Sequence, residues 1–333
     1  MKYLFGIIII FLFFAGIWYA TSNTKMPEGE SARTDVMHAE DISIVTSFYP
    51  LEFALTRIVG DVGTVTNIGA GSDPHNFEPT TKDMVAMQRA DVVVLQGAEF
   101  EPWSDSTIDR LEADGVPVII ATDTIELHEG GHNHEDEGHE EAETEHENEH
   151  EEEVHEDEHH HGAYDPHTWL DPILFSQTVT YLTERISVID PGNAATYQEN
   201  AAILQSELAA LNNEYENRLA DCALTEVITS HDAFGYLAER YHFEVHSIAG
   251  LSTQDTPSVT TMAELKEEAA EGIDAILLEE NSVAAYGETL ARETGLQTLT
   301  INPIAYIVPT GHNYLTLMRS NLTAFATALQ CHD

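Results

Sequence analysis

The sequence predicts an α/β fold of two similar lobes, each a roughly four-stranded parallel sheet with flanking helices, joined by one long rigid helix. Two observations lead to this fold class. Short β-rich runs alternate with helical stretches in both halves of the chain, and strands joined by helices pair in parallel beneath a helical cover. A helical stretch of about 25 residues without Gly or Pro separates the halves. The 333 residues have room for two domains of about 150 residues each.

In the first half, a β-rich run starts at Ile42 and breaks at Pro50, before a helix that we expect at 51–59. Further strands are predicted at 62–68, 92–95 and 116–120, and further helices at 81–89, 103–112 and 173–189. The separating helix is predicted at 194–219, after an Asp-Pro-Gly turn. At 1.5 Å per residue it would be roughly 37 Å long, so we interpret it as a rigid connector between the lobes.

The second half repeats the alternation of strand and helix. Strands are predicted at 226–229, 243–248, 275–278 and 297–301, and helices at 234–241, 262–271, 282–294 and 314–329. We therefore divide the chain into a signal sequence or membrane anchor (1–24), a tether (25–40), an N-terminal lobe (41–190), a connecting helix (191–220) and a C-terminal lobe (221–333).

The amino terminus carries an apolar run from Leu4 to Ala20 behind Lys2. Its length lies between that of a signal-peptide core and that of a full membrane span, and Lys2 favours a cytoplasmic amino end. No Cys follows the run, which excludes a lipid-modified cysteine there. We expect an uncleaved anchor with the body of the protein outside the cytoplasmic membrane.

Residues 126–161 differ from the rest of the chain: they contain ten His and seventeen Asp or Glu, with no Lys or Arg. A segment with so few apolar residues cannot bury a core, so we expect a disordered loop over 126–163. Neutral imidazole is a common ligand of zinc and its neighbours, and carboxylates attract dications. The alternatives are accessory metal binding and a merely solvated acidic loop. The candidate accessory ligands are His128, His132, His134, His139, His146, His150, His155, His159, His160 and His161.

The acidity extends over the whole chain. The formal charge is −46, of which residues 126–161 contribute −17, so the remainder carries −29. Such a protein repels nucleic-acid phosphates and anionic lipids and attracts cations. Nucleic-acid binding is therefore excluded as a function class. A saline habitat would also explain an acidic surface, and the sequence does not separate this explanation from metal attraction.

Cys222 and Cys331 are the two cysteines, and they form no CxxC motif, which argues against a zinc ribbon or a redox motif. A disulfide between them is chemically allowed outside the cytoplasm. Two unrelated free thiols are an equally good interpretation, because spacing along a chain does not reveal proximity.

Three histidines stand where ligand sites of parallel sheets are expected. His75 and His167 each occur in an Asp-Pro-His sequence in a loop, and His231 is expected directly after a strand. If the lobes face each other, the three imidazoles meet in the interlobe cleft and make a good zinc site, with water or a carboxylate as the fourth ligand. Asp73 and Asp165 are placed to accept the other ring N–H. The alternative for any single residue is a surface turn histidine.

Six phrases resemble, in their order along the chain, the zinc and manganese solute-binding proteins of ABC importers. They are SFYP (47–50), GSDPHNFEP (71–79), DPHTWLDP (165–172), YQEN (197–200), HDAFGY (231–236) and GLS (250–252). The resemblance covers about residues 41–330 and implies pseudo-symmetric lobes with limited hinge motion. It also implies that His75, His167 and His231 ligate the metal. The His-rich insertion resembles the zinc-binding branch, and a third imidazole in place of the Glu of the manganese branch favours Zn²⁺.

The resemblance implies a monomeric, extracytoplasmic protein, in the periplasm or on the outer face of the cytoplasmic membrane, whose partner is the membrane permease of a zinc ABC importer. Zn²⁺ would be its transported ligand. One departure concerns the fourth ligand, because Asn302 stands where many relatives have Asp. We therefore expect three histidines plus water, or a ligand from the His-rich loop, with Asn302 only as a neighbour. Glu279, just beyond a predicted strand, has two interpretations, of which we favour a helix cap over a partner of a metal ligand.

The same residues also allow other functions. A solute-binding protein for manganese or another divalent metal, an adhesin and a zinc buffer are alternatives within binding proteins. A zinc hydrolase is a further alternative, since three histidines with an open water position also suit hydrolysis. The sequence contains no HExxH motif, and we expect no enzymatic activity. Because the loop histidines are too mobile to define one geometry, we interpret 126–161 as an antenna that collects zinc for the cleft.

Overall fold

The computed structural model describes residues 41–129, 164–253, 255–279 and 284–332. Residues Asp41–Asp333 form one compact unit. The predicted anchor, the tether and nine of the ten accessory histidines lie outside the described residues. Among the described helices, none combines the length and apolar character needed to cross a lipid bilayer.

The first sheet consists of four parallel strands, β1 (Ile42–Thr46), β2 (Gly63–Asn67), β3 (Val92–Leu95) and β4 (Val118–Ile120). Their spatial order is β2-β1-β3-β4. The central strand β3 is buried along its whole length, which explains its continuous run of Val and Leu. The helices of this lobe are α2 (Tyr49–Val59), α3 (Thr81–Arg89), α4 (Ser104–Ala113) and α5 (Pro172–Ile189).

The second sheet consists of β5 (Glu226–His231), β6 (Glu244–Ala249), β7 (Ala275–Leu278) and β8 (Gln297–Thr300), again all parallel. Their order, β6-β5-β7-β8, repeats that of the first sheet. Its helices are α7 (Gly235–Tyr241), α8 (Val259–Glu271), α9 (Ala284–Thr294) and α10 (Tyr314–Ala328). The predicted α/β class with two pseudo-symmetric four-stranded sheets is confirmed, while the exact division into domains stays a prediction.

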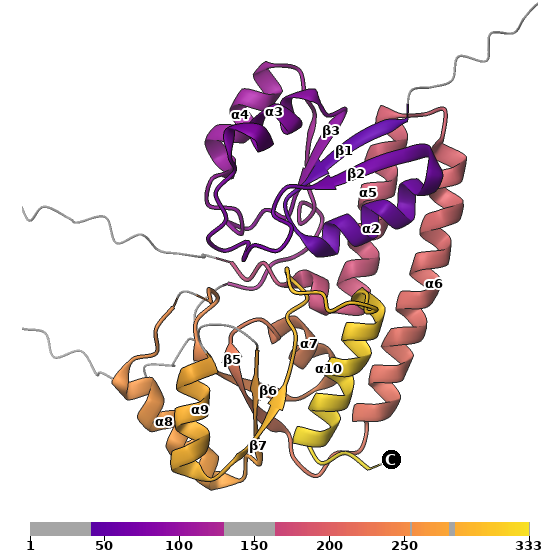
Figure 1. The fold of residues 1–333 in the computed structure, drawn as a ribbon. Helices are drawn as coiled ribbons and strands as arrows, with labels where there is room; N and C mark the ends of the chain where they lie inside the picture. Colours follow the sequence, from indigo (N-terminus) through magenta and orange to yellow (C-terminus); the bar gives the residue numbers. More distant parts are fainter. Residues whose placement is uncertain (1–40, 130–163, 254, 280–283, 333) are drawn as a thin grey trace, which may run out of the picture. The chain divides into compact units, whose positions relative to one another are not determined.

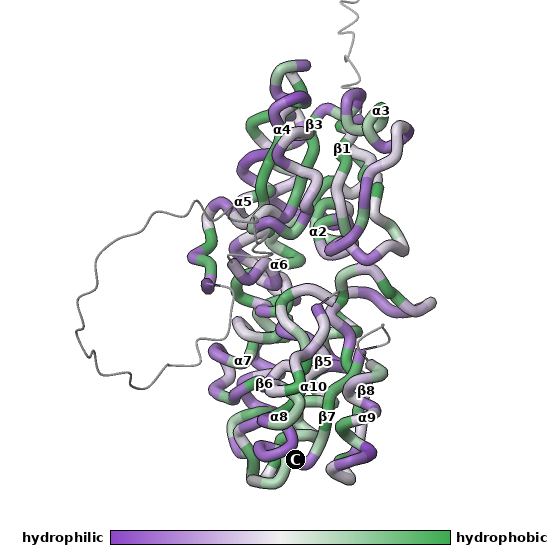
Figure 2. Tube along the Cα trace, turned by 90° about the vertical axis from the view of Figure 1, so that its left-hand side faces the viewer, coloured by the Kyte–Doolittle hydropathy of each residue, from purple (hydrophilic) through white to green (hydrophobic). Residues whose placement is uncertain are grey.

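The long helix α6 (Ala194–Leu219) packs on helices of both lobes. It contacts α2 and α5 of the first lobe and α10 of the second, and Figure 1 shows it running alongside both lobes. Its inward face buries Leu204, Leu208 and Leu211, and the Tyr215 hydroxyl donates a 2.6 Å hydrogen bond to the Met318 carbonyl in α10. A single apolar cluster therefore continues from one lobe into the other. Figure 2 shows the hydrophobic strands β3 and β7 inside their lobes.

Buried polar contacts also join the lobes directly. The Asp171 carboxylate caps α5 by accepting from the Ile173 amide at 2.7 Å, and it accepts from Nε of Arg240 in α7 at 2.5 Å. The Trp169 indole N–H donates to the Pro303 carbonyl at 2.8 Å. Because such bonds fix orientation as well as distance, they hold the two lobes in register.

Several expected boundaries differ from the structure by one to three residues, most of all that of α8, which was expected from 262 and begins at Val259. Helix α2 begins at Tyr49, so Pro50 lies inside its first turn. Proline is tolerated there because the backbone N–H groups of the first turn make no hydrogen bond within the helix, and the missing N–H of proline costs nothing. Strand β5 extends to His231, which was expected to follow the strand. His231 is therefore the last residue of a buried strand, held by the sheet itself.

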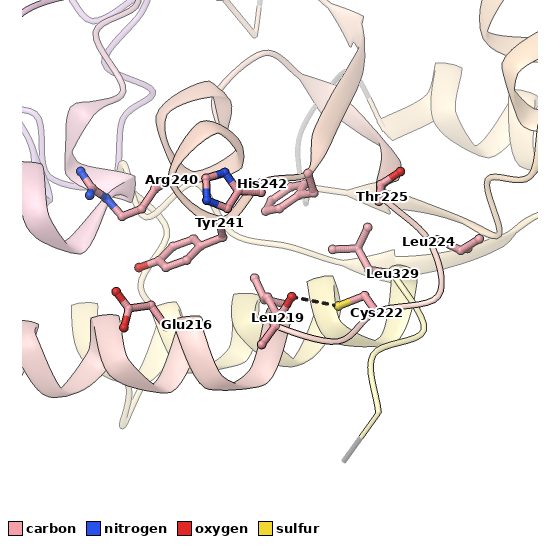
Figure 3. A pocket seen from close by; sticks show the side chains of 11 residues that line it. Glu216, Leu219, Cys222, Leu224, Thr225, Arg240, Tyr241, His242 and Leu329 are labelled. Atoms are coloured by element: carbon pink, nitrogen blue, oxygen red, sulfur yellow. Dashed lines mark hydrogen bonds between the residues drawn. The ribbon is translucent and has the colours of Figure 1, made fainter.

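Cys222 and Cys331 form a disulfide that joins the end of α6 to the carboxyl terminus. Beside it lies a cavity of about 410 Å³ between the end of α6 and the segment after α7 (Figure 3). Leu219, Tyr241 and Phe243 are among the residues that line it. None of the three candidate metal ligands lines this cavity.

Candidate metal centre

The three histidines singled out in the sequence come together between the lobes. One nitrogen from each of His75, His167 and His231 lies within 4.8 Å of the others. The ring centroids are separated by 5.3 to 6.1 Å. Nitrogens that bind one tetrahedral Zn²⁺ at about 2.0 to 2.1 Å lie about 3.4 Å apart. Small side-chain movements would therefore bring all three nitrogens to one ion.

His75 lies in the loop between β2 and α3. The Asp73 carboxylate oxygen Oδ1 accepts a 3.1 Å hydrogen bond from the His75 amide. This bond fixes the backbone between Asp73 and His75. The ring meets the edge of the Phe100 ring at a centroid distance of 4.9 Å. Phe100 follows a sharp turn at Gly97, whose φ is +84° and where an added Cβ would come within 2.3 Å of Ile120. Glycine at this turn thus allows the aromatic wall against which His75 packs.

His167 is held by its own loop and by the first sheet. The Asp165 carboxylate accepts from the His167 amide at 2.9 Å and lies 2.8 Å from ring nitrogen Nδ1. Gln96, just after β3, donates to the Pro166 carbonyl at 2.7 Å and to the Thr168 hydroxyl at 3.1 Å. The ring therefore directs Nε2 away from Asp165 and towards the other histidines.

His231 is oriented by Glu279, for which the sequence favoured a helix cap over contact with a metal ligand. The Glu279 carboxylate oxygen Oε1 lies 2.5 Å from Nδ1 of His231, and both side chains are buried. Glu279 directly follows β7, which pairs with β5. That position, one residue beyond a strand, is what made contact with a metal ligand one of the two interpretations of Glu279. The contact with His231 supports that interpretation.

Burial and mutual repulsion govern the charge of the cluster. Burial, together with the neighbouring imidazoles, holds the pKa values of His75 and His167 well below the ordinary value. Burial also acts to lower the pKa of His231, but the charge and hydrogen bond of Glu279 outweigh it and raise that pKa. Burial raises the pKa of Asp165 to about 7. Two of the three rings are thus neutral, the form that binds metal.

Nδ1 of His231 is occupied by its contact with Glu279, but two Nε2 atoms of the cluster are buried without a hydrogen-bond partner in the described part of the chain. They are Nε2 of His167 and Nε2 of His231. A buried nitrogen without a partner costs free energy, which a bound cation would offset. The donor set therefore suits a borderline-soft dication such as Zn²⁺.

The side chain of Asn302 makes hydrogen bonds to backbone groups of its own loop. Its side-chain oxygen accepts from the Ile304 amide at 2.6 Å, and its side-chain nitrogen donates to the Ile307 carbonyl at 3.1 Å. A role of Asn302 beside the metal stays a prediction. His128, the one accessory histidine within the described residues, stacks on Tyr236 and lies 2.8 Å from the Glu239 carboxylate. It is not a member of the three-histidine cluster, although its carbonyl accepts from the Asp165 amide at 2.9 Å.

Comparisons with known proteins agree with this fold. A model of the family "ZnuA: Zinc-uptake complex component A periplasmic" matches residues 44–328. The zinc-binding lipoprotein AdcA of Streptococcus pneumoniae is 33% identical over 92% of this chain and 57% of its own length, so the chain spans little more than half of that relative. The high-affinity zinc uptake system protein ZnuA of Bacillus subtilis is 33% identical, with 93% of each chain covered.

Solved structures of similar proteins have the same fold. The AdcAII protein of Streptococcus pneumoniae superposes with a TM-score of 0.74 at 27% identity, over 87% of this chain and 100% of that one. The Zn(II)-bound ZnuA-like domain of Streptococcus pneumoniae AdcA superposes with a TM-score of 0.69 at 29% identity, over 87% and 99% of the two chains. The chain therefore belongs to the ZnuA family, the periplasmic component A of zinc-uptake complexes.

Proposed function

We propose that this protein captures Zn²⁺ outside the cytoplasmic membrane and delivers it to the permease of an ABC importer. The ion is its cargo. His75, His167 and His231 are the ligands, and water or a residue of the His-rich loop completes a tetrahedral shell. The observation that carries the proposal is the convergence of three imidazoles with partnerless buried Nε2 atoms on two of them.

The orientation of the rings supports zinc as the cargo. Asp165 and Glu279 hold Nδ1 of His167 and His231, which leaves Nε2 of each ring for the ion. No carboxylate joins the three histidines in the cluster found among the described residues. Because Mn²⁺ prefers oxygen ligands, an all-nitrogen set favours Zn²⁺.

The comparisons support delivery rather than catalysis. Relatives carry names of zinc-binding and zinc-uptake proteins, and two similar lobes around a central ion suit capture and release. The acidic chain, with a formal charge of −46, attracts dications to the site. We further propose that residues 126–161 collect zinc loosely, that the amino-terminal segment anchors the protein, and that it acts as a monomer.

The proposal is tested by titrating the metal-free protein with Zn²⁺ against a competing chelator. The triple variant with His75, His167 and His231 replaced by Ala is expected to lose the tight site. His312→Ala is the matched control, because His312 is exposed and lies outside the cluster. Tight zinc binding that survives in the triple variant would refute the assignment. Competition with Mn²⁺ in the same titration tests the preference for zinc.

A further inference from the structure

The three histidines are unequally accessible. His167 and His231 each expose 1% of their surface, whereas His75 is half-buried. Among the three histidines, solvent therefore reaches the cluster most readily on the side of His75. The residues that hold the His75 loop in place are the ones able to control the exchange of an ion there.

The Asp73 carboxylate holds this loop with both oxygens. Oδ1 accepts from the His75 amide at 3.1 Å, within the loop. Oδ2 accepts from the hydroxyl of Thr253, which lies 180 residues further along the chain, after β6 in the second lobe. Thr253 exposes 4% of its surface and Asp73 is partly exposed, so the bond between them is partly shielded from competing water. This hydrogen bond thus joins the His75 loop to the opposite lobe.

The segment that carries Thr253 is itself braced. The Asp255 carboxylate accepts from the Ser252 amide at 3.1 Å, and it packs so closely on Gly250 that an added Cβ there would come within 2.5 Å of it. The Gly250 carbonyl accepts at 3.1 Å from the amide of Asp232, the neighbour of His231. Thr253 therefore presents its hydroxyl from a support that is continuous with the backbone of a buried candidate ligand.

We propose that the Asp73–Thr253 hydrogen bond is a latch that sets the rate of zinc exchange. While it is formed, it holds the His75 loop against the second lobe and keeps the third imidazole on the ion. When it breaks, His75 moves away first, and the ion is left on two histidines facing the open side. The latch rests on the proposed function, in that it assumes zinc to be the ion held by the cluster.

The test measures zinc dissociation from the loaded full-length protein by rapid mixing with excess chelator and a fluorescent zinc indicator. Thr253→Val removes the hydroxyl at nearly constant volume and is expected to accelerate dissociation about tenfold, the effect of losing one hydrogen bond to a charged group. Thr253→Ser keeps the donor and is expected to dissociate at the rate of the unmodified protein. Thr256→Val is the control, since Thr256 is exposed in the same segment.

A second variant keeps the test decisive if Thr253→Val destabilises the fold. Asp73→Ala removes the acceptor and is expected to accelerate dissociation as well, and adding Thr253→Val to it is expected to have no further effect. Dissociation from Thr253→Val at the unmodified rate, or from Thr253→Ser as fast as from Thr253→Val, would overturn the latch. Absence of tight zinc binding in the unmodified protein would instead overturn the proposed function.

Discussion

The two lobes have the same strand order but present their histidines differently. His231 ends β5, an interior strand, and its ring is held by Glu279 from the adjacent strand β7. His75 lies in a loop beyond β2, an edge strand, and depends on Asp73 and Thr253 for its position. The repeated architecture therefore provides one candidate ligand fixed by a sheet and one carried by a loop. A site built in this way can hold an ion firmly and still open on one side.

The largest expected loss of zinc affinity comes from substituting His231, and it should exceed the loss from substituting His75. His231→Ala removes the fixed nitrogen and leaves the Glu279 carboxylate beside a buried gap, so zinc affinity should fall by more than about 100-fold, the upper limit for losing an orienting partner. His75→Ala should cost less, because water can enter at the half-buried loop position. Competitive titration with a chelator measures both. Equal losses would mean that the lobes contribute alike.

A smaller loss is expected from Glu279→Gln. The amide keeps the shape of the side chain but removes the charge that orients and polarises His231, so affinity should decrease about 10- to 100-fold. Glu244→Gln, at an exposed position of β6, is the control. Unchanged affinity in Glu279→Gln would show that the sheet alone fixes the ring.

The pH dependence of zinc affinity should be governed by His231, the histidine of the second lobe. Because Glu279 raises the pKa of His231, the metal-free site holds a proton there up to a higher pH than an ordinary imidazole would, and zinc must displace it. Zinc affinity should therefore begin to fall at a higher pH on acidification than for an unperturbed histidine. His75 and His167, with depressed pKa values, stay neutral until the pH is much lower. In Glu279→Gln the decline should move to lower pH, as measured by titrations over a pH series.

The smallest effect on the tight site is expected from removing the His-rich segment. Glu129 and Tyr164 form an antiparallel bridge, so an Asn-Gly turn can replace residues 130–163. The tight site should keep its affinity, while weaker additional zinc equivalents disappear from calorimetric titrations. Loss of the tight site in this deletion would make the His-rich segment, and not the cleft, the principal site.

The order of helices and strands could be predicted from the amino-acid sequence, because hydrophobic periodicity and breaker residues act locally. The bounds of α6, β3 and β7 agree with those predicted, and α2 and β5 differ by two residues each. The three histidines were also identifiable from the sequence. Each occupies a loop or strand end, where parallel sheets place their ligands.

Which distant groups meet could not be predicted from the sequence, because it depends on how the chain packs in three dimensions. The pairing of Glu279 with His231 depends on β7 lying next to β5, and strand order is set by packing rather than by local pattern. The Cys222–Cys331 disulfide and the Asp73–Thr253 hydrogen bond join residues 109 and 180 positions apart. The physical reason is that these contacts form when the two lobes close on a shared core, and no local property of the chain encodes that approach.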